Sequence, residues 1–163
     1  MKEKARKTQE LYETIKEALS KKSWDQINSN LLEKRLQWYE KYKNNLNLKG
    51  SDVRKAYTLL LIEYLKIPPG EVPIVHEEKN KIIWRSYNSC SVLEACKKGV
   101  FDTRIVCKNG WEQSTQLLIS KINPCLVFSR NYEKIRPYTP YCEEGIELLI
   151  DNDFSNKKSS KTF

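Results

Sequence analysis

The sequence predicts an α+β fold, in which three N-terminal helices precede a small antiparallel sheet with short helices between its strand pairs. Three observations lead to this class. Apolar residues recur at helical spacing through residues 1–67, short β-branched and aromatic runs begin after Pro68-Pro69-Gly70, and helical segments separate the first pair of runs from the second. The 163 residues suit one domain, which we place at residues 1–150.

The helical half is defined by apolar residues at i, i+3, i+4 and i+7 and by residues that start and stop helices. Ser23 and Gln26 form a capping box that starts the second helix, which ends before Gly50. Ser51 caps the third helix, and Pro68 stops it. The three helices are predicted over residues 2–22, 23–49 and 51–67.

The remaining elements are predicted from changes in the spacing of apolar residues and from residues typical of turns. Ser91 with Glu94 forms another capping box, and Asp102 or Thr103 caps a short helix that contains Cys107. The tail, residues 151–163, is rich in Asn, Ser and Lys and is predicted to be disordered. The other predicted elements are a β-hairpin over 72–77 and 81–87, helices over 91–97 and 111–122, and strands over 126–135 and 141–150.

The charge of the chain limits its partners. The net charge is +8, and residues 1–49 hold twelve basic and seven acidic side chains. Lysine outnumbers arginine, which favours a solvated surface over a nucleic-acid interface, because base and phosphate recognition draws on arginine. Binding of RNA or of a partner protein by the basic helices of residues 1–49 stays open as an alternative.

Cysteine usage and the N-terminus predict a cytoplasmic protein with free thiols and no membrane partner. Five cysteines is an odd number, the first residues are charged, and no run approaches the roughly 20 apolar residues of a membrane span. The cysteine spacing lacks the Cys-x2-Cys pair typical of structural metal sites, so no metal is predicted, and no cofactor is indicated.

Two cysteines have polar neighbours that suit a reactive thiol. Cys107 follows Arg104 near the start of a short helix, where positive charge and free N–H groups favour a thiolate. Cys142 precedes Glu143 and Glu144, one of which could serve as a base or orient the thiol. His76, the single histidine, is either a general base or an outward-facing strand residue.

Arginine and tyrosine alternate on two predicted strands that we expect to be neighbours. Arg85 and Tyr87 lie on the first, and Arg130 and Tyr132 lie on the second. Residues two apart share one face of a strand, so the two pairs predict a ligand-binding sheet face. Arg130 suits a ligand carboxylate.

An ordered series of short motifs runs from Asn88 to Leu148. It consists of Cys90 with Glu94-Ala-Cys, Ile-Val-Cys107, Asn123-Pro-x-Leu-x-Phe-x-Arg130, and Cys142 with the acidic and apolar strand after it. By these motifs the segment resembles the C-terminal part of the L-2-amino-thiazoline-4-carboxylate hydrolase family. The chain has Arg136-Pro-Tyr-Thr-Pro-Tyr where members of that family tend to have a Gly-rich turn.

The resemblance implies hydrolysis of a small carboxylate-bearing cyclic amidine or amide, such as the opening of a thiazoline ring toward an N-carbamoyl-cysteine. It implies Cys107 or Cys142 as the nucleophile or orienting thiol. The implied partners are Arg130 as carboxylate anchor, Glu143 or His76 as proton carrier and Asn88 as donor to the developing anion, with Cys90, Tyr132 and Arg85 nearby.

Two further questions stay open at the level of sequence. A non-catalytic ligand-binding or redox-sensing domain would use the same residues without a nucleophile. The aromatic cluster of Trp38, Tyr39 and Tyr42 fits either the core or the contact face of a homo-oligomer.

Overall fold

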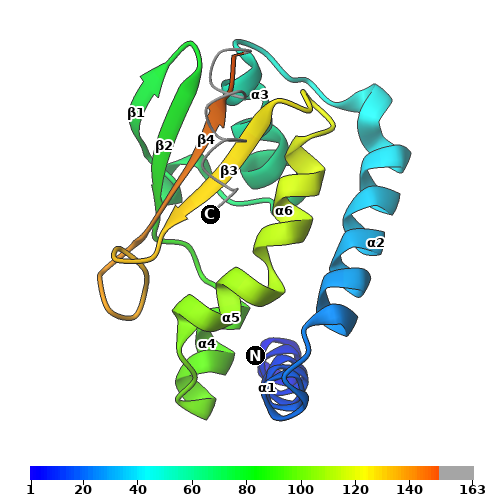
Figure 1. Cartoon of the computed structure of the whole chain (residues 1–163), viewed down its shortest axis with the longest axis vertical. Coiled ribbons are helices and arrows are strands. Elements are labelled where there is room, and N and C mark those ends of the chain that lie inside the picture. The colour runs from blue at the N-terminus through cyan, green and yellow to red at the C-terminus, as the bar shows by residue number, and fades with distance from the viewer. Residues whose placement is uncertain (151–163) are drawn as a thin grey trace, which may run out of the picture.

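The computed structural model describes residues 1–150 and confirms the predicted α+β class (Figure 1). Within these residues six α-helices accompany one four-stranded antiparallel sheet, and the helical half precedes the sheet. The tail predicted to be disordered, residues 151–163, lies outside the described residues.

Most predicted elements form within a few residues of their expected bounds. The helices are α1 (Lys2–Lys21), α2 (Asp25–Tyr42), α3 (Asp52–Tyr57), α4 (Ser91–Gly99), α5 (Thr103–Gly110) and α6 (Glu112–Ile119). Short helical turns occur at η1 (Lys43–Asn45), η2 (Thr58–Tyr64) and η3 (Pro69–Glu71). The strands are β1 (Ile74–Glu78), β2 (Lys81–Ser86), β3 (Leu126–Asn131) and β4 (Cys142–Leu148).

Two helix starts carry the predicted side-chain caps. The Ser51 hydroxyl accepts a hydrogen bond from the backbone N–H of Arg54 at 3.3 Å, and the Asp102 carboxylate accepts one from the N–H of Arg104 at 2.9 Å. Each cap satisfies one of the N–H groups that the first turn of a helix leaves without a partner.

The two predicted capping boxes are wrong. At the start of α2 the cap position is Trp24 rather than Ser23, and no side chain caps it. At the start of α4 the cap is Cys90 rather than Ser91, and its sulfur accepts a hydrogen bond from the N–H of Leu93 at 3.5 Å. The thiol of Cys90, a predicted site residue, therefore caps the N-terminus of α4.

The third predicted helix divides into two types of helix. After α3, the chain continues as the π-helix η2, and the N–H of Leu65 bonds to the carbonyl of Leu60, five residues back. Three consecutive leucines of η2, residues 59–61, are all buried in the main core. Apolar spacing predicts a helix here and does not separate the α from the π form.

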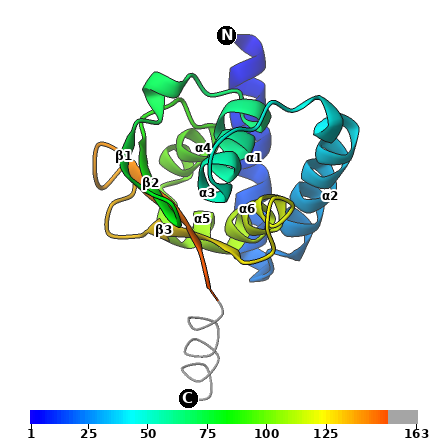
Figure 2. The ribbon, with the colours of Figure 1, turned by 90° about the horizontal axis from the view of Figure 1, so that it is seen from above.

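The sheet has the order β1-β2-β4-β3, so the last strand of the chain, β4, lies between β2 and β3. Ile82, Trp84, Phe128 and Ile146 point to one side, the helix face, and are buried. Helices α3 and α6 cover this face, and α2 packs outside α6 (Figure 2). The opposite side, the open face, carries no helix in the part of the chain that the structure describes.

A second, smaller core lies beside the first, where α1 packs against α4 (Figure 1). Ile15 of α1 is buried there together with Ala95, Cys96 and Val106. The molecule therefore has one core under the sheet and another between its helices.

A single side chain joins α6 to the outer strand β3. The Gln116 amide donates to the carbonyl of Leu126 and accepts from the N–H of Phe128, each at 2.8 Å. Both backbone groups belong to residues whose side chains are buried. Gln116 thus takes the place of a neighbouring strand at this point.

We expect Gln116→Ala to lower the free energy of unfolding by about 1–3 kcal/mol, because it leaves a backbone donor and an acceptor without partners. Urea unfolding followed by circular dichroism measures the change. Gln37→Ala is the matched control, since the Gln37 amide bonds only to the exposed Glu33, and it should change stability by less than about 0.5 kcal/mol. Equal effects of the two substitutions would contradict this role.

Candidate functional site

Two rows of charged and polar residues cross the sheet, one on each face. Strand register aligns Arg85 with Glu143 and Asn131 on the open face. One residue along, it aligns Glu144 with Arg130 on the helix face. The prediction that the two arginine-bearing strands are neighbours is therefore wrong, because β4 separates them and their arginines lie on opposite faces.

The open-face row forms around Glu143. Its carboxylate lies 3.3 Å from Nε of Arg85 and 3.6 Å from Nζ of Lys134, and the Asn131 amide donates to it at 3.5 Å. The Arg85 guanidinium also stacks over the Tyr141 ring at 4.4 Å. Glu143 is thus held by cations and turned away from the thiols, which argues against its predicted role as proton carrier.

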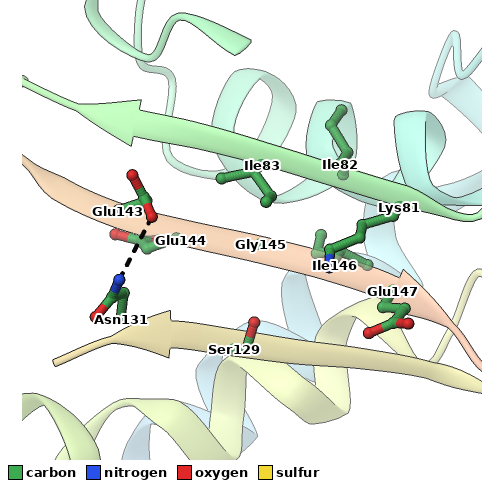
Figure 3. A pocket seen from close by; sticks show the side chains of 10 residues that line it. All are labelled: Lys81, Ile82, Ile83, Ser129, Asn131, Glu143, Glu144, Gly145, Ile146 and Glu147. Carbon is green, nitrogen blue, oxygen red and sulfur yellow. Dashed lines mark hydrogen bonds between the residues drawn. The ribbon is translucent and has the colours of Figure 1, made fainter. Parts of the chain in front are cut away.

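Beside this row the open face has a shallow hollow of about 160 Å³ (Figure 3). Its floor is Gly145, where an added Cβ would lie only 3.1 Å from the carbonyl oxygen of Ile82. Lys81 and Glu147 flank it at one end and Asn131 and Glu143 at the other. None of the five cysteines lines this hollow.

The helix-face row is a largely buried ion pair. Nη2 of Arg130 lies 3.7 Å from the Glu144 carboxylate, and the two side chains are 13% and 11% exposed. Burial alone would lower the pKa of Arg130, but the Glu144 carboxylate, together with Cys107, Tyr132 and Cys142, outweighs burial and the pKa is raised. Nη1 of Arg130 is buried without an acceptor among residues 1–150. Arg130 is thus already engaged by Glu144, which a ligand carboxylate would have to displace.

Several predicted thiols lie close enough to Arg130 to affect one another. Burial raises the pKa of the Cys107 thiol to about 12, against the opposing charge of Arg130. The thiols of Cys90 and Cys142 and the carboxylate of Glu144 add to this rise. On the sheet itself, Cys142, Glu144 and Arg130 share the helix face.

The expectation that Cys107 would be a thiolate is wrong. Arg104, its predicted activator, points outward and pairs with Asp102 at 2.9 Å. Burial dominates at the thiol instead, and its raised pKa leaves it protonated at neutral pH. A protonated, buried thiol is a poor nucleophile.

Cys142 has a different environment. Its sulfur accepts hydrogen bonds from the backbone N–H and from Nε of Arg136, both at 3.4 Å. The same guanidinium donates from Nη1 to the backbone carbonyl of Asn88 at 2.6 Å. The Asn88 amide is directed to the carbonyl of Ser89, at 3.1 Å, so Asn88 contributes its backbone rather than its side chain.

Arg136 also connects this site to α5. Its backbone carbonyl accepts a hydrogen bond from the Thr103 hydroxyl at 2.8 Å, and the Thr103 side chain is buried. One residue of the β3–β4 connection therefore contacts Cys142, the segment before α4 and the first turn of α5.

Two other predicted site residues have structural partners. The Tyr132 hydroxyl donates to the carboxylate of Glu112 on α6, and burial raises the pKa of Tyr132. His76 is exposed on the outer strand β1, lies 2.9 Å from Glu78, and is opposite Ile83 on the open face. The sheet separates it from Cys107, so His76 is not placed to act as its base.

Arg136 is a site residue that the sequence analysis missed. Of the two glutamates named beside Cys142, Glu144 is the one that shares a strand face with it, because it is two residues away. Arg136 lies in a connection with no periodic pattern, and its role depends on how that loop folds back onto β4.

Among residues 1–150, no three His, Cys, Asp or Glu side chains gather closely enough to hold a metal ion. In the same range, no helix combines the length and the apolar character that a membrane span requires. All five thiols are free.

No protein-family model, curated protein or solved structure matches this chain. The similarity to the thiazoline-carboxylate hydrolases therefore stays a prediction that depends on the residues quoted for it.

We expect the free energy of unfolding to fall as pH rises from about 9 toward 12, because the Cys107 thiol ionises near pH 8.5 in the unfolded chain and near 12 in the folded one. A group with a raised folded pKa stabilises the protein below the unfolded pKa and loses that contribution above it. Cys107→Ala should reduce the slope by up to about 1.4 kcal/mol per pH unit.

Urea unfolding at pH 8, 9 and 10 measures these slopes. Val106→Ala is the control, because it opens a cavity in the neighbouring fully buried position and removes no ionisable group. It should lower stability equally at every pH. The assignment is wrong if Cys107→Ala and Val106→Ala show the same slope.

Proposed function

We propose that this protein is a non-catalytic sensor domain for small oxidants or electrophiles, with Cys142 as its responsive thiol. The observation that carries the proposal is the pair of N–H donors from Arg136 on the Cys142 sulfur. A thiolate is the reactive form of cysteine, and a guanidinium is among the groups that stabilise it.

The neighbouring thiols support this choice by contrast. Cys96 is fully buried in the smaller core, and burial raises its pKa to about 12, as it does for Cys107. Cys142 and Cys107 are both half-buried, but Cys142 also accepts a hydrogen bond from the Arg136 side chain. Cys142 therefore combines partial access from solvent with a cationic hydrogen-bond donor.

The contacts of Arg136 give the reaction a structural consequence. A peroxide would oxidise the Cys142 thiol to a sulfenic acid, with transfer of one oxygen to sulfur and release of water or an alcohol. The altered sulfur would no longer accept the same two hydrogen bonds from Arg136. Because Arg136 also holds Asn88 and Thr103, the change would loosen the β3–β4 connection from α4 and α5.

We expect iodoacetamide at pH 7 to modify Cys142 at least about tenfold faster than Cys96 or Cys107, since only a small thiolate fraction forms when the pKa is raised. Arg136→Met should slow the Cys142 reaction by about three- to tenfold. Peptide mass spectrometry after timed quenching gives the rate at each cysteine.

Arg104→Met is the matched control, because it removes an arginine on α5 that pairs only with Asp102 and stacks on Tyr138. It should leave the Cys142 rate unchanged. The proposal fails if all five cysteines react at similar rates in the folded protein, or if Arg104→Met and Arg136→Met slow Cys142 equally.

Hydrolysis of a small carboxylate-bearing cyclic amidine remains a second candidate. The observation that favours it is that Cys142 lies on the same strand face as Arg130, the group expected to anchor a carboxylate. Of the two cysteines implied as nucleophile, Cys142 is the one we propose, and Glu144 is the carboxylate on the same strand face.

Incubation with 2-amino-thiazoline-4-carboxylate distinguishes the two functions. A sensor domain leaves the compound intact over many hours, whereas a hydrolase releases N-carbamoyl-cysteine with turnover and loses this activity in Cys142→Ala. Mass detection of the ring-opened product, with heat-denatured protein as the blank, decides between them.

A further inference from the structure

The C-terminal end of α2 borders a hollow that the site around Cys142 does not use. Trp38 packs partly against the main core here, whereas Tyr42 is 38% exposed. The hollow therefore joins an aromatic wall to a carboxylate and an ammonium group. It has a volume of about 230 Å³ and is lined by Trp38, Tyr42, Asn45, Leu46, Glu63 and Lys66.

Trp38 and Tyr42 form the aromatic wall, one helical turn apart on α2. Their ring centres are 5.5 Å apart, and the Tyr64 ring packs edge-on against Trp38 at 5.0 Å. Tyr64 itself packs against the main core, so it holds the indole ring in place. A wall of this kind suits stacking with a flat ring of a ligand.

Glu63 and Lys66 bring opposite charges to the hollow. Nζ of Lys66 lies 3.9 Å from the Glu63 carboxylate, and the two side chains are 71% and 29% exposed. An ion pair that reaches solvent at this distance contributes little stability, so a ligand can separate it. A ligand with an anionic group for Lys66 and N–H donors for Glu63 would replace the pair by two matched contacts.

The backbone beside these two charges is irregular. Glu63 belongs to the π-helix η2. Lys66 has a φ of 56°, in the left-handed region that residues other than glycine rarely adopt. Both features occur in the segment that supplies the charged side of the hollow, and such departures from regular backbone cluster at binding sites.

We infer that this hollow binds the guanine base of a nucleotide, either free or within a single RNA strand. The base stacks on Trp38 and Tyr42, and its two adjacent N–H groups donate to the Glu63 carboxylate. The flexible Lys66 side chain leaves Glu63 and contacts the phosphate. Residues 1–49 hold twelve basic and seven acidic side chains, which favours an anionic ligand at this end of α2. The inference does not depend on the reactivity of Cys142.

Titration of the full chain with guanosine monophosphate, followed by the indole N–H signals of the four tryptophans in heteronuclear NMR, tests this site. We expect a Kd of about 1 mM or tighter and a larger shift of the Trp38 signal than of the other three. Uridine monophosphate offers one N–H donor instead of an adjacent pair and should bind at least about fivefold more weakly. Equal binding of the two mononucleotides would overturn the inference.

An RNA strand that holds one guanosine among uridines distinguishes the two sources of the nucleotide. An affinity more than about tenfold above that of the mononucleotide, falling steeply with salt, assigns the site to RNA. A smaller difference assigns it to the free nucleotide. Absence of a Trp38 shift with both ligands would overturn the inference.

Variants assign the binding to the proposed contacts. Tyr42→Leu should weaken the binding of guanosine monophosphate at least about fivefold, because it removes one stacking surface. Glu63→Gln should reduce the preference for guanosine over uridine monophosphate to less than about twofold, since a neutral amide accepts the N–H groups more weakly than a carboxylate does. Wild-type affinity in Tyr42→Leu, or the full preference in Glu63→Gln, contradicts the site.

Tyr87→Leu is the matched control for stacking on any exposed tyrosine. Tyr87 follows β2, is 48% exposed and, like Tyr42, packs against a second aromatic ring, that of Tyr141 at 5.7 Å. The variant should keep the wild-type affinity for guanosine monophosphate, and thermal unfolding checks that each variant is folded. A loss of affinity in Tyr87→Leu equal to that in Tyr42→Leu would assign the binding to unspecific stacking and sink the proposal.

Discussion

The position of β4 inside the sheet is the constraint on which the rest of the structure depends. Because β2 and β3 both pair with it, the alternation of its residues is fixed on each side. A shift of one residue would move Glu144 and Ile146 to the open face and would turn Glu143 toward the core. Every polar contact described around Cys142 and Arg130 follows from this single register.

The sheet and the helices contribute different parts of the polar region beneath β4. The strands supply the ion pair and Cys142, whereas α5 supplies Cys107 and α6 supplies Glu112, the partner of Tyr132. Charges at such a junction are shielded from water, so they act on one another strongly. This explains why burial, rather than the nearest arginine in sequence, controls the Cys107 thiol.

The sequence predicted the elements better than the contacts between them. The helical period of residues 2–22 and the cap at Ser51 are local signals, and both were confirmed. The order of the strands was not accessible, because nothing local indicates that β4 enters between β2 and β3. The predicted arginine face therefore split into Arg85 on one side and Arg130 on the other. The role of Arg136 was missed because its loop folds back onto β4.

The Gln116 side chain has a consequence for how this sheet meets other molecules. An edge strand normally offers free N–H and carbonyl groups on which a strand from another chain can align. Along β3, the amide of Gln116 already occupies two such groups, at Leu126 and Phe128. A strand from another chain would have to displace the Gln116 amide before it could pair with these two backbone groups. Gln116 therefore protects this edge of the sheet from strand addition.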